Sequence, residues 1–250
     1  MHVTVPGMRA ADTAMIVRRA DSTVLLITQP DHAALAARIM RRWTAIELAQ
    51  SQRRDEILHA VEHHDDGWLE VDRAPIIDET TGELLDFITS PVAVRRGIWP
   101  RGVALLATTP YAAALVAQHA VHVYRRYRDD PAWATFFGEM ESLRAHHLRE
   151  AAPATLEMLL SDYRWLRTGD ILSLAFCNAW SDVQHDERGG SARLTDDRLV
   201  LTPDPFGGAE VALALPAREM SAAPFASAAA AAVAYARAPT TILSGVAAGA

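Results

Sequence analysis

Lysine is absent from the 250-residue chain, and all 24 of its basic residues are arginine. No lysine is therefore available as a Schiff-base former or a nucleophile. The 31 acidic residues outnumber the arginines and give a formal net charge of −7. A general nucleic-acid binder needs a basic face, so we expect no nucleic-acid partner.

Cysteine and long apolar runs are also scarce. The single cysteine, Cys177, excludes an internal disulfide and any Cys-rich zinc site. The longest apolar run, 226–236, is mostly alanine and is too short to span a bilayer. Residues 1–19 lack the basic start and the apolar core of a signal peptide. We therefore expect a cytoplasmic protein without a membrane partner.

The hydrophobic pattern predicts a single α+β domain that is mainly helical. The expected elements within 1–250 are a β-hairpin over 14–29, a helical body over 30–180, returning strands over 191–215 and a helix over 225–238. We expect the end strands to join the hairpin in a small antiparallel sheet beside a helical bundle. Residues 69–98 show little periodicity, which is typical of a functional loop or a lid.

Three histidines and three acidic residues crowd into residues 58–68, Leu-His-Ala-Val-Glu-His-His-Asp-Asp-Gly-Trp. We predict a helix that ends at Gly67, because glycine favours the position just after a helix C-terminus. Helical periodicity places His64 and Asp65 on the apolar side of this helix. The polar side carries His59, Glu62, His63 and Asp66.

A competing motif lies in the same segment. Residues 59–63, His-Ala-Val-Glu-His, fit the H-x-x-E-H signature of inverted zinc proteases. In that alternative, His59 and His63 hold zinc and Glu62 acts as the base. Because all three residues lie on the polar side of the helix, we interpret them as solvated and favour His64 and Asp65 as metal ligands.

Single histidines or acids also interrupt the apolar faces of other predicted helices. These residues are His32, His119, His147 and Asp170. An unpaired polar group in a core costs about 1–3 kcal/mol, so each residue needs a partner. A shared metal would supply one, and imidazole with carboxylate suits iron, manganese or zinc. Alternatives stay open: His122 or His146 in place of His147, and a helix N-cap role for Asp170.

The order of these residues resembles the HD-domain metalloenzymes. His32 heads one helix, His64-Asp65 precedes Asp66-Gly67 on the next, and Asp170 follows far along the chain. The intervening His119 and His147 resemble the dinuclear branches of that superfamily, which include phosphodiesterases and mixed-valent diiron oxygenases. The resemblance therefore implies an HD-like bundle with two divalent ions, of iron or manganese, with zinc as a further option. Trp68 departs from the pattern, in which a basic residue often follows the glycine, so no phosphate contact is implied there.

Nearly the whole chain is also similar to a bacterial family known as domain-of-unknown-function family 3891. The segments that carry this similarity are Leu-Ile-Thr-Gln-Pro-Asp-His at 26–32, His-Asp-Asp-Gly-Trp at 64–68, Gly-Glu-Leu-Leu-Asp-Phe at 82–87 and Asp-Ile-Leu-Ser-Leu at 170–174. The family name implies no activity.

The HD resemblance implies an enzyme that acts on a small molecule, by one of two reactions. We favour hydrolysis of a small phosphoester by metal-activated water, with His64 and Asp65 as candidate catalytic residues. The alternative is a diiron oxygenase that acts on a small polar substrate with O₂. The arginines that follow the HD segment, Arg73, Arg95 and Arg96, are candidates for holding an anionic substrate. A non-catalytic metal-binding protein is the third hypothesis, and a homo-oligomer is compatible with the sequence.

Overall fold

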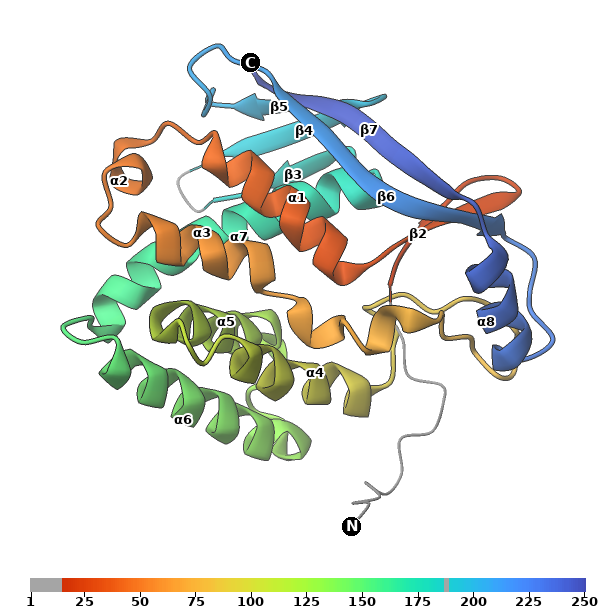
Figure 1. The fold of residues 1–250 in the computed structure, drawn as a ribbon, viewed down its shortest axis with the longest axis horizontal. Helices are drawn as coiled ribbons and strands as arrows, with labels where there is room; N and C mark the ends of the chain where they lie inside the picture. The colour runs from red at the N-terminus through yellow and green to blue at the C-terminus, as the bar shows by residue number, and fades with distance from the viewer. Residues whose placement is uncertain (1–14, 187–188) are drawn as a thin grey trace.

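A curled sheet of seven strands forms one side of the protein (Figure 1). The computed structural model describes residues 15–186 and 189–250. The strands are β1 (Ile16–Arg19), β2 (Thr23–Ile27), β3 (Asp182–Gln184), β4 (Ser191–Thr195), β5 (Arg198–Thr202), β6 (Val211–Ser221) and β7 (Thr240–Gly249). Their order across the sheet is β1-β2-β6-β7-β5-β4-β3. All neighbours are antiparallel except β5 and β7, which are parallel.

The predicted small antiparallel sheet beside an HD-like helical bundle is therefore wrong. The expected hairpin is present as β1 and β2, although residue 14, where it was expected to begin, lies outside the described residues. The main difference is β7, a strand rich in alanine and glycine that lies in the middle of the sheet. Its second half, residues 244–249, is Ser-Gly-Val-Ala-Ala-Gly and has low strand propensity, and pairing with β6 and β5 overrides that propensity.

Eight α-helices are described. They are α1 (Gln29–Arg41), α2 (Ile46–Ala49), α3 (Arg54–His63), α4 (Val92–Leu105), α5 (Pro110–Val123), α6 (Ala134–Glu150), α7 (Leu156–Asn178) and α8 (Ala228–Arg237). Short 3₁₀ turns occur at η1 (Asp66–Trp68), η2 (Val71–Arg73), η3 (Arg125–Tyr127) and η4 (Pro131–Trp133). Helices α1 and α7 contact the sheet, α3 and α5 follow them, and α6 lies farthest from it (Figure 1).

One apolar core joins the sheet to the helices. Alternate residues of β6, namely Val211, Leu213, Leu215 and Ala217, are buried in it with residues of α1, α3, α5 and α7. A smaller cluster lies near α8, where Tyr235 packs with Met220 and with Ile77 and Leu84 of the loop before α4. No helix in the described part of the chain is both long and apolar enough to cross a membrane.

Helix α7 continues through Gly169, the residue before Asp170. The glycine does not break the helix but allows a close approach. A Cβ at this position would lie 2.8 Å from Cγ of Met40 in α1 and 3.1 Å from Cγ1 of Val61 in α3. Because Gly169 has no side chain, α1 and α3 can both pack closely beside Asp170. Asp170 therefore lies inside a helix, and the N-cap alternative for it is wrong.

The predicted loop over 69–98 is only partly irregular. It contains η2 and an isolated bridge between Ile77 and Leu84, and α4 begins within it at Val92. Helix α4 includes Gly97, Pro100 and Gly102, which disfavour a helix in a sequence-based reading.

Candidate metal centre

Four helices bring five polar side chains to one buried place. His32 lies in the first turn of α1, where Pro30 and the Thr28 cap set the start of the helix. His64 and Asp65 follow the last residue of α3, and the other two residues, His119 and Asp170, lie within α5 and α7. The three histidine side chains are at most 4% exposed, and the two carboxylates are 9% and 13% exposed.

The Nε2 atoms of the three histidines all face the two carboxylates. His32 Nε2 lies 2.8 Å from Asp65 Oδ2, and His64 Nε2 lies 3.6 Å from the same oxygen. Asp170 uses its two oxygens separately, with Oδ1 3.5 Å from His64 Nε2 and Oδ2 3.7 Å from His119 Nε2. One ligand atom each of His32, His64 and Asp170 lies within 4.8 Å of the other two, which is close enough to share a metal ion.

The opposite ring nitrogens are held by partners outside the cluster. His64 Nδ1 lies 2.8 Å from the carbonyl oxygen of Val61, and a carbonyl only accepts, so Nδ1 carries a proton. The Ser173 hydroxyl donates to the carbonyl of Asp170 and can therefore accept from His32 Nδ1 at 2.9 Å. His119 Nδ1 lies 2.9 Å from the Tyr163 hydroxyl. Outer partners of this kind fix the ring orientation and tautomer of metal-ligating histidines.

The two carboxylates favour a positive charge between them, and this preference shifts the pKa values of the neighbouring groups. Burial by itself lowers the pKa of His64, but the charges of Asp65 and Asp170 outweigh burial and raise it to about 9. Burial similarly opposes ionisation of Asp170, yet the contact with His64 and nearby imidazoles lower the pKa of that carboxyl to about 2. For His119 burial prevails and the pKa falls to about 4, so this ring is neutral at pH 7.

The structure also places the remaining sequence candidates. The predicted division of the α3 segment by face is confirmed, since His64 and Asp65 are buried whereas His59, Glu62 and His63 are only half-buried. In the rival H-x-x-E-H motif, Glu62 pairs with Arg41 and His63 pairs with Asp66.

His147 does not join the other five candidates. It is buried on α6 and groups with His146 and Glu150 in a second cluster of potential ligands, whose other two members are exposed. His122 lies on α5 with its ring 5.2 Å from that of Tyr163.

The three candidate arginines occupy different environments. Arg73 is exposed on η2, and Arg96 donates to the carbonyl of Ala132 while lying over the ring of Trp133. Arg95 is half-buried like Arg96, and its Nε atom is inaccessible and has no hydrogen-bond partner among the described residues.

Sequence reasoning missed the residues that hold the histidines from outside. Ser173 falls on the same predicted face as Asp170, three residues further along α7, and that spacing was an available signal. Tyr163 lies seven residues before Asp170, two helical turns away on the same face. The Val61 carbonyl gives no signal in a sequence, because every residue has one.

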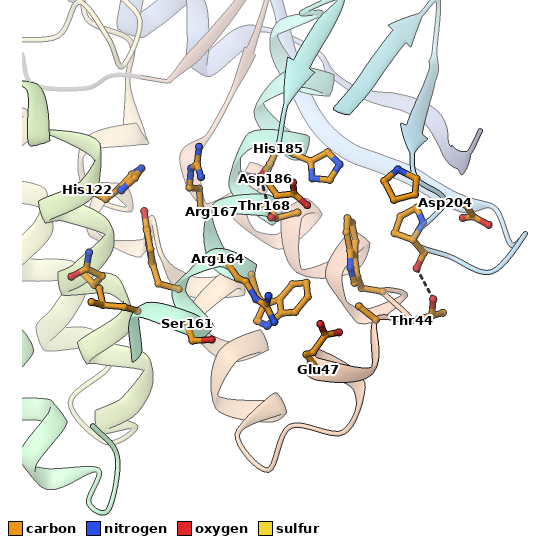
Figure 2. Close-up of a pocket in the computed structure, with 18 residues that line it drawn as sticks. Thr44, Glu47, His122, Ser161, Arg164, Arg167, Thr168, His185, Asp186 and Asp204 are labelled. Carbon is orange, nitrogen blue, oxygen red and sulfur yellow. Dashed lines mark hydrogen bonds between the residues drawn. The ribbon is translucent and has the colours of Figure 1, made fainter. Parts of the chain in front are cut away.

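Figure 2 shows the residues that line a cavity of about 580 Å³. Tyr163 lines this cavity and also contacts His119, so one side chain separates the two sites. None of the five residues of the centre lines the cavity in the described structure.

Comparison with known proteins identifies the family without assigning an activity. No curated protein and no solved structure matches the chain significantly. A family model does match, over residues 15–222, and its description is "Protein of unknown function (DUF3891)". The match covers most of the chain and confirms the similarity seen in the sequence. The protein therefore belongs to the DUF3891 family.

Proposed function

We propose that the protein is an HD-type, metal-dependent hydrolase that cleaves a small phosphoester. The observation that carries the proposal is the arrangement of three buried imidazoles. Each ring has Nδ1 engaged by an outer partner and Nε2 directed at a pair of carboxylates. The ordered residues of the HD resemblance, His32, His64-Asp65 and Asp170, all belong to this arrangement.

The donor set suits a divalent ion. His64 Nε2 is buried and makes no hydrogen bond within the described residues, and it lies 3.6 Å from Asp65 Oδ2 and 3.5 Å from Asp170 Oδ1, a separation that leaves room for an ion shared by the three atoms. We propose that His32, His64, Asp65 and Asp170 hold one ion. His119 and the second oxygen of Asp170 are the ligands proposed for another. Imidazoles with carboxylates and no thiolate favour iron, manganese or zinc.

A bound ion would lower the pKa of water and polarise a phosphoryl oxygen. The protein's own residues have the remaining tasks. Asp65 orients the attacking water and accepts its proton at a carboxylate oxygen. Ser173 and the Val61 carbonyl keep His32 and His64 in the orientation that presents Nε2. Burial raises the pKa of Tyr163 well above its ordinary value, so its hydroxyl stays protonated beside His119.

The proposed function is tested by metal content together with hydrolysis. The protein purified under anaerobic conditions should contain manganese, iron or zinc, and should hydrolyse 4-nitrophenyl phosphate or bis(4-nitrophenyl) phosphate. Chelation should abolish hydrolysis and lower the melting temperature by about 5–10 °C, as expected for an ion present at about 100 times its Kd. Two irons with an O₂-sensitive mixed-valent signal and no hydrolysis would favour the oxygenase. Absence of bound metal, with unchanged stability on chelation, would contradict both enzymes.

Metal affinity should depend on pH through His64. Because the pKa of this ring is about 9 in the metal-free protein, an ion must displace its proton at neutral pH. The apparent Kd should fall about tenfold per pH unit from pH 7 to pH 9 and level off above. Calorimetric titration at several pH values measures this slope. An affinity that is constant from pH 7 to pH 9 would contradict the assignment of His64 as a ligand.

Metal affinity should rise from pH 7 to pH 9, whereas the stability of the chelated protein should fall over the same range. A pKa raised from 6.5 to about 9 on folding means that the folded state binds this proton more tightly. The corresponding stability is complete below pH 6.5 and is lost as the pH rises through 9. Chelated protein should therefore become less stable from pH 7 to pH 9, while metal-loaded protein gains affinity for its ion.

A further inference from the structure

A second group of possible metal ligands lies on α6, the helix farthest from the sheet (Figure 1). It consists of His146, His147 and Glu150. One ligand atom of each residue lies within 4.8 Å of those of the other two. Helix α6 contributes no residue to the buried centre, so this group is separate from the site described above.

The helix itself brings the three side chains together. Glu150 follows His147 by three residues and His146 by four, and side chains at both spacings are neighbours on a helix surface. His146 Nε2 lies 3.9 Å from Glu150 Oε1, and both of these side chains are about half exposed and free to rotate. Two ligand atoms of one tetrahedral zinc ion lie about 3.3–3.6 Å apart, because each bond is about 2.0–2.2 Å long. Small side-chain rotations can therefore close the group around an ion.

His147 is the buried member of the group. It continues the buried stripe of α6 after Phe136 and Met140, and it is 6% exposed. Its Nδ1 atom is inaccessible to solvent and has no hydrogen-bond partner among the described residues. Burial and, to a smaller extent, the nearby His146 lower the pKa of this ring, so it is neutral at pH 7 and keeps a lone pair for a metal. Packing thus fixes the position of an imidazole that is available to bind a cation.

The charges around the group favour a cation. The group lies at the C-terminal end of α6, where the backbone carbonyls carry a partial negative charge, and Glu150 adds a full one. Arg149 lines a groove that none of the three ligands lines, together with residues of the turn before α7. Arg53 approaches the same helix end and donates to the carbonyl of Ala151 at 3.0 Å, and its charge is balanced by Glu56, also at 3.0 Å.

We propose that His146, His147 and Glu150 form a zinc site that stabilises the C-terminal end of α6. Two imidazoles and a carboxylate are common zinc ligands, and they leave the fourth tetrahedral position to water. Because two of the three ligands are exposed and none lines the cavity of about 580 Å³, we assign the ion to stability and not to catalysis. The site uses no residue of the buried centre and does not depend on the proposed function.

Titration of the full chain with Zn²⁺ tests the site, after the buried centre has been loaded with metal. Wild type should bind one further zinc ion. Its Kd should rise at least about tenfold in Glu150→Gln and in His146→Ala, because loss of even an outer-sphere partner costs about 10–100-fold in metal affinity. Both side chains are exposed, so both variants should fold. The same ion should bind to His64→Ala with the Kd of the wild type, because α6 takes no part in the centre.

His63→Ala is the matched control for the two ligand variants. His63 is also a half-buried histidine beside carboxylates, those of Glu62 and Asp66. These residues do not form a group of three ligand atoms within 4.8 Å in the described part of the chain, so His63→Ala should bind zinc as the wild type does. Loss of the further zinc ion in His63→Ala, with retention in His146→Ala, would place the ion in the H-x-x-E-H segment and overturn the proposal.

The melting temperature distinguishes a stabilising site from weak binding at the surface. Zinc at about 100 times its wild-type Kd should raise the melting temperature of the wild type by about 5–10 °C. At the same concentration the rise in Glu150→Gln should be at most about half as large, because its Kd is at least tenfold higher. The proposal is overturned if no further zinc ion binds at millimolar zinc, or if wild type, Glu150→Gln and His146→Ala bind it equally.

Discussion

Replacement of His64 by alanine is expected to lower metal affinity by more than about 100-fold, beyond the 10–100-fold typical for loss of an outer-sphere partner. His64 is the ring whose Nε2 faces both Asp65 and Asp170, at 3.6 Å and 3.5 Å. Its removal leaves two buried carboxylates without the group that connects them. Elemental analysis and calorimetric titration with Mn²⁺ and Zn²⁺ measure the loss, and phosphoester hydrolysis should disappear with the metal.

Two other histidines provide matched controls for this substitution. His63 is the preceding residue, is half-exposed and bonds to Asp66, so His63→Ala should change metal affinity little. His147 is buried like His64 but lies in the separate cluster on α6, so His147→Ala should leave the metal content of the centre unchanged. Loss of metal in His63→Ala with retention in His64→Ala would instead support the H-x-x-E-H protease motif. Circular dichroism of the chelated variants checks that each one folds.

The candidate centre could be predicted because its residues are polar but lie on apolar helix faces. A histidine or an acid on an apolar helix face needs a partner, and this requirement identified His32, His64, Asp65, His119 and Asp170 on their separate helices. The structure brings all five together. His147 satisfied the same criterion and lies elsewhere, because periodicity shows that a residue faces inward and does not show which neighbour it meets.

The parts that could not be predicted depend on tertiary packing. Strand β7 consists largely of small residues, and its place in the sheet follows from pairing with β6 and β5. Helix α4 contains two glycines and a proline, yet it forms where η1 and α5 pack against it. The cavity shown in Figure 2 has a related origin, since only the folded chain brings α7 beside segments from four other parts of the sequence.

The structural role of Gly67 also differs from the helix-cap role that the sequence predicts. A glycine after a helix is commonly a left-handed cap, but Gly67 is not among the described residues with positive φ, and η1 continues the chain through it. A Cβ at Gly67 would lie 2.1 Å from the carbonyl oxygen of Ile98 and 3.1 Å from the backbone nitrogen of Gly102. Contact between the two backbones, and not a helix cap, therefore requires glycine two residues after Asp65.

Gly67→Ala is accordingly expected to lower the free energy of unfolding by about 3 kcal/mol, the upper part of the range for an overpacked core. The added methyl group would have to displace the backbone of α4, which cannot yield as a flexible side chain can. For a chain of this size the melting temperature should fall by about 6–12 °C, measurable by calorimetry of the metal-loaded protein.

The same helix supplies the control for Gly67→Ala. A Cβ added at Gly97 of α4 would meet no atom within 4 Å, so Gly97→Ala should raise the free energy of unfolding by about 0.5–1 kcal/mol through helix propensity alone. If Gly67→Ala melts at the temperature of the wild type, α4 must be able to move away from η1. In that case Gly67 would not be what holds His64 and Asp65 against the other ligands. If it melts early and also loses metal, the close contact with α4 is part of what positions the centre.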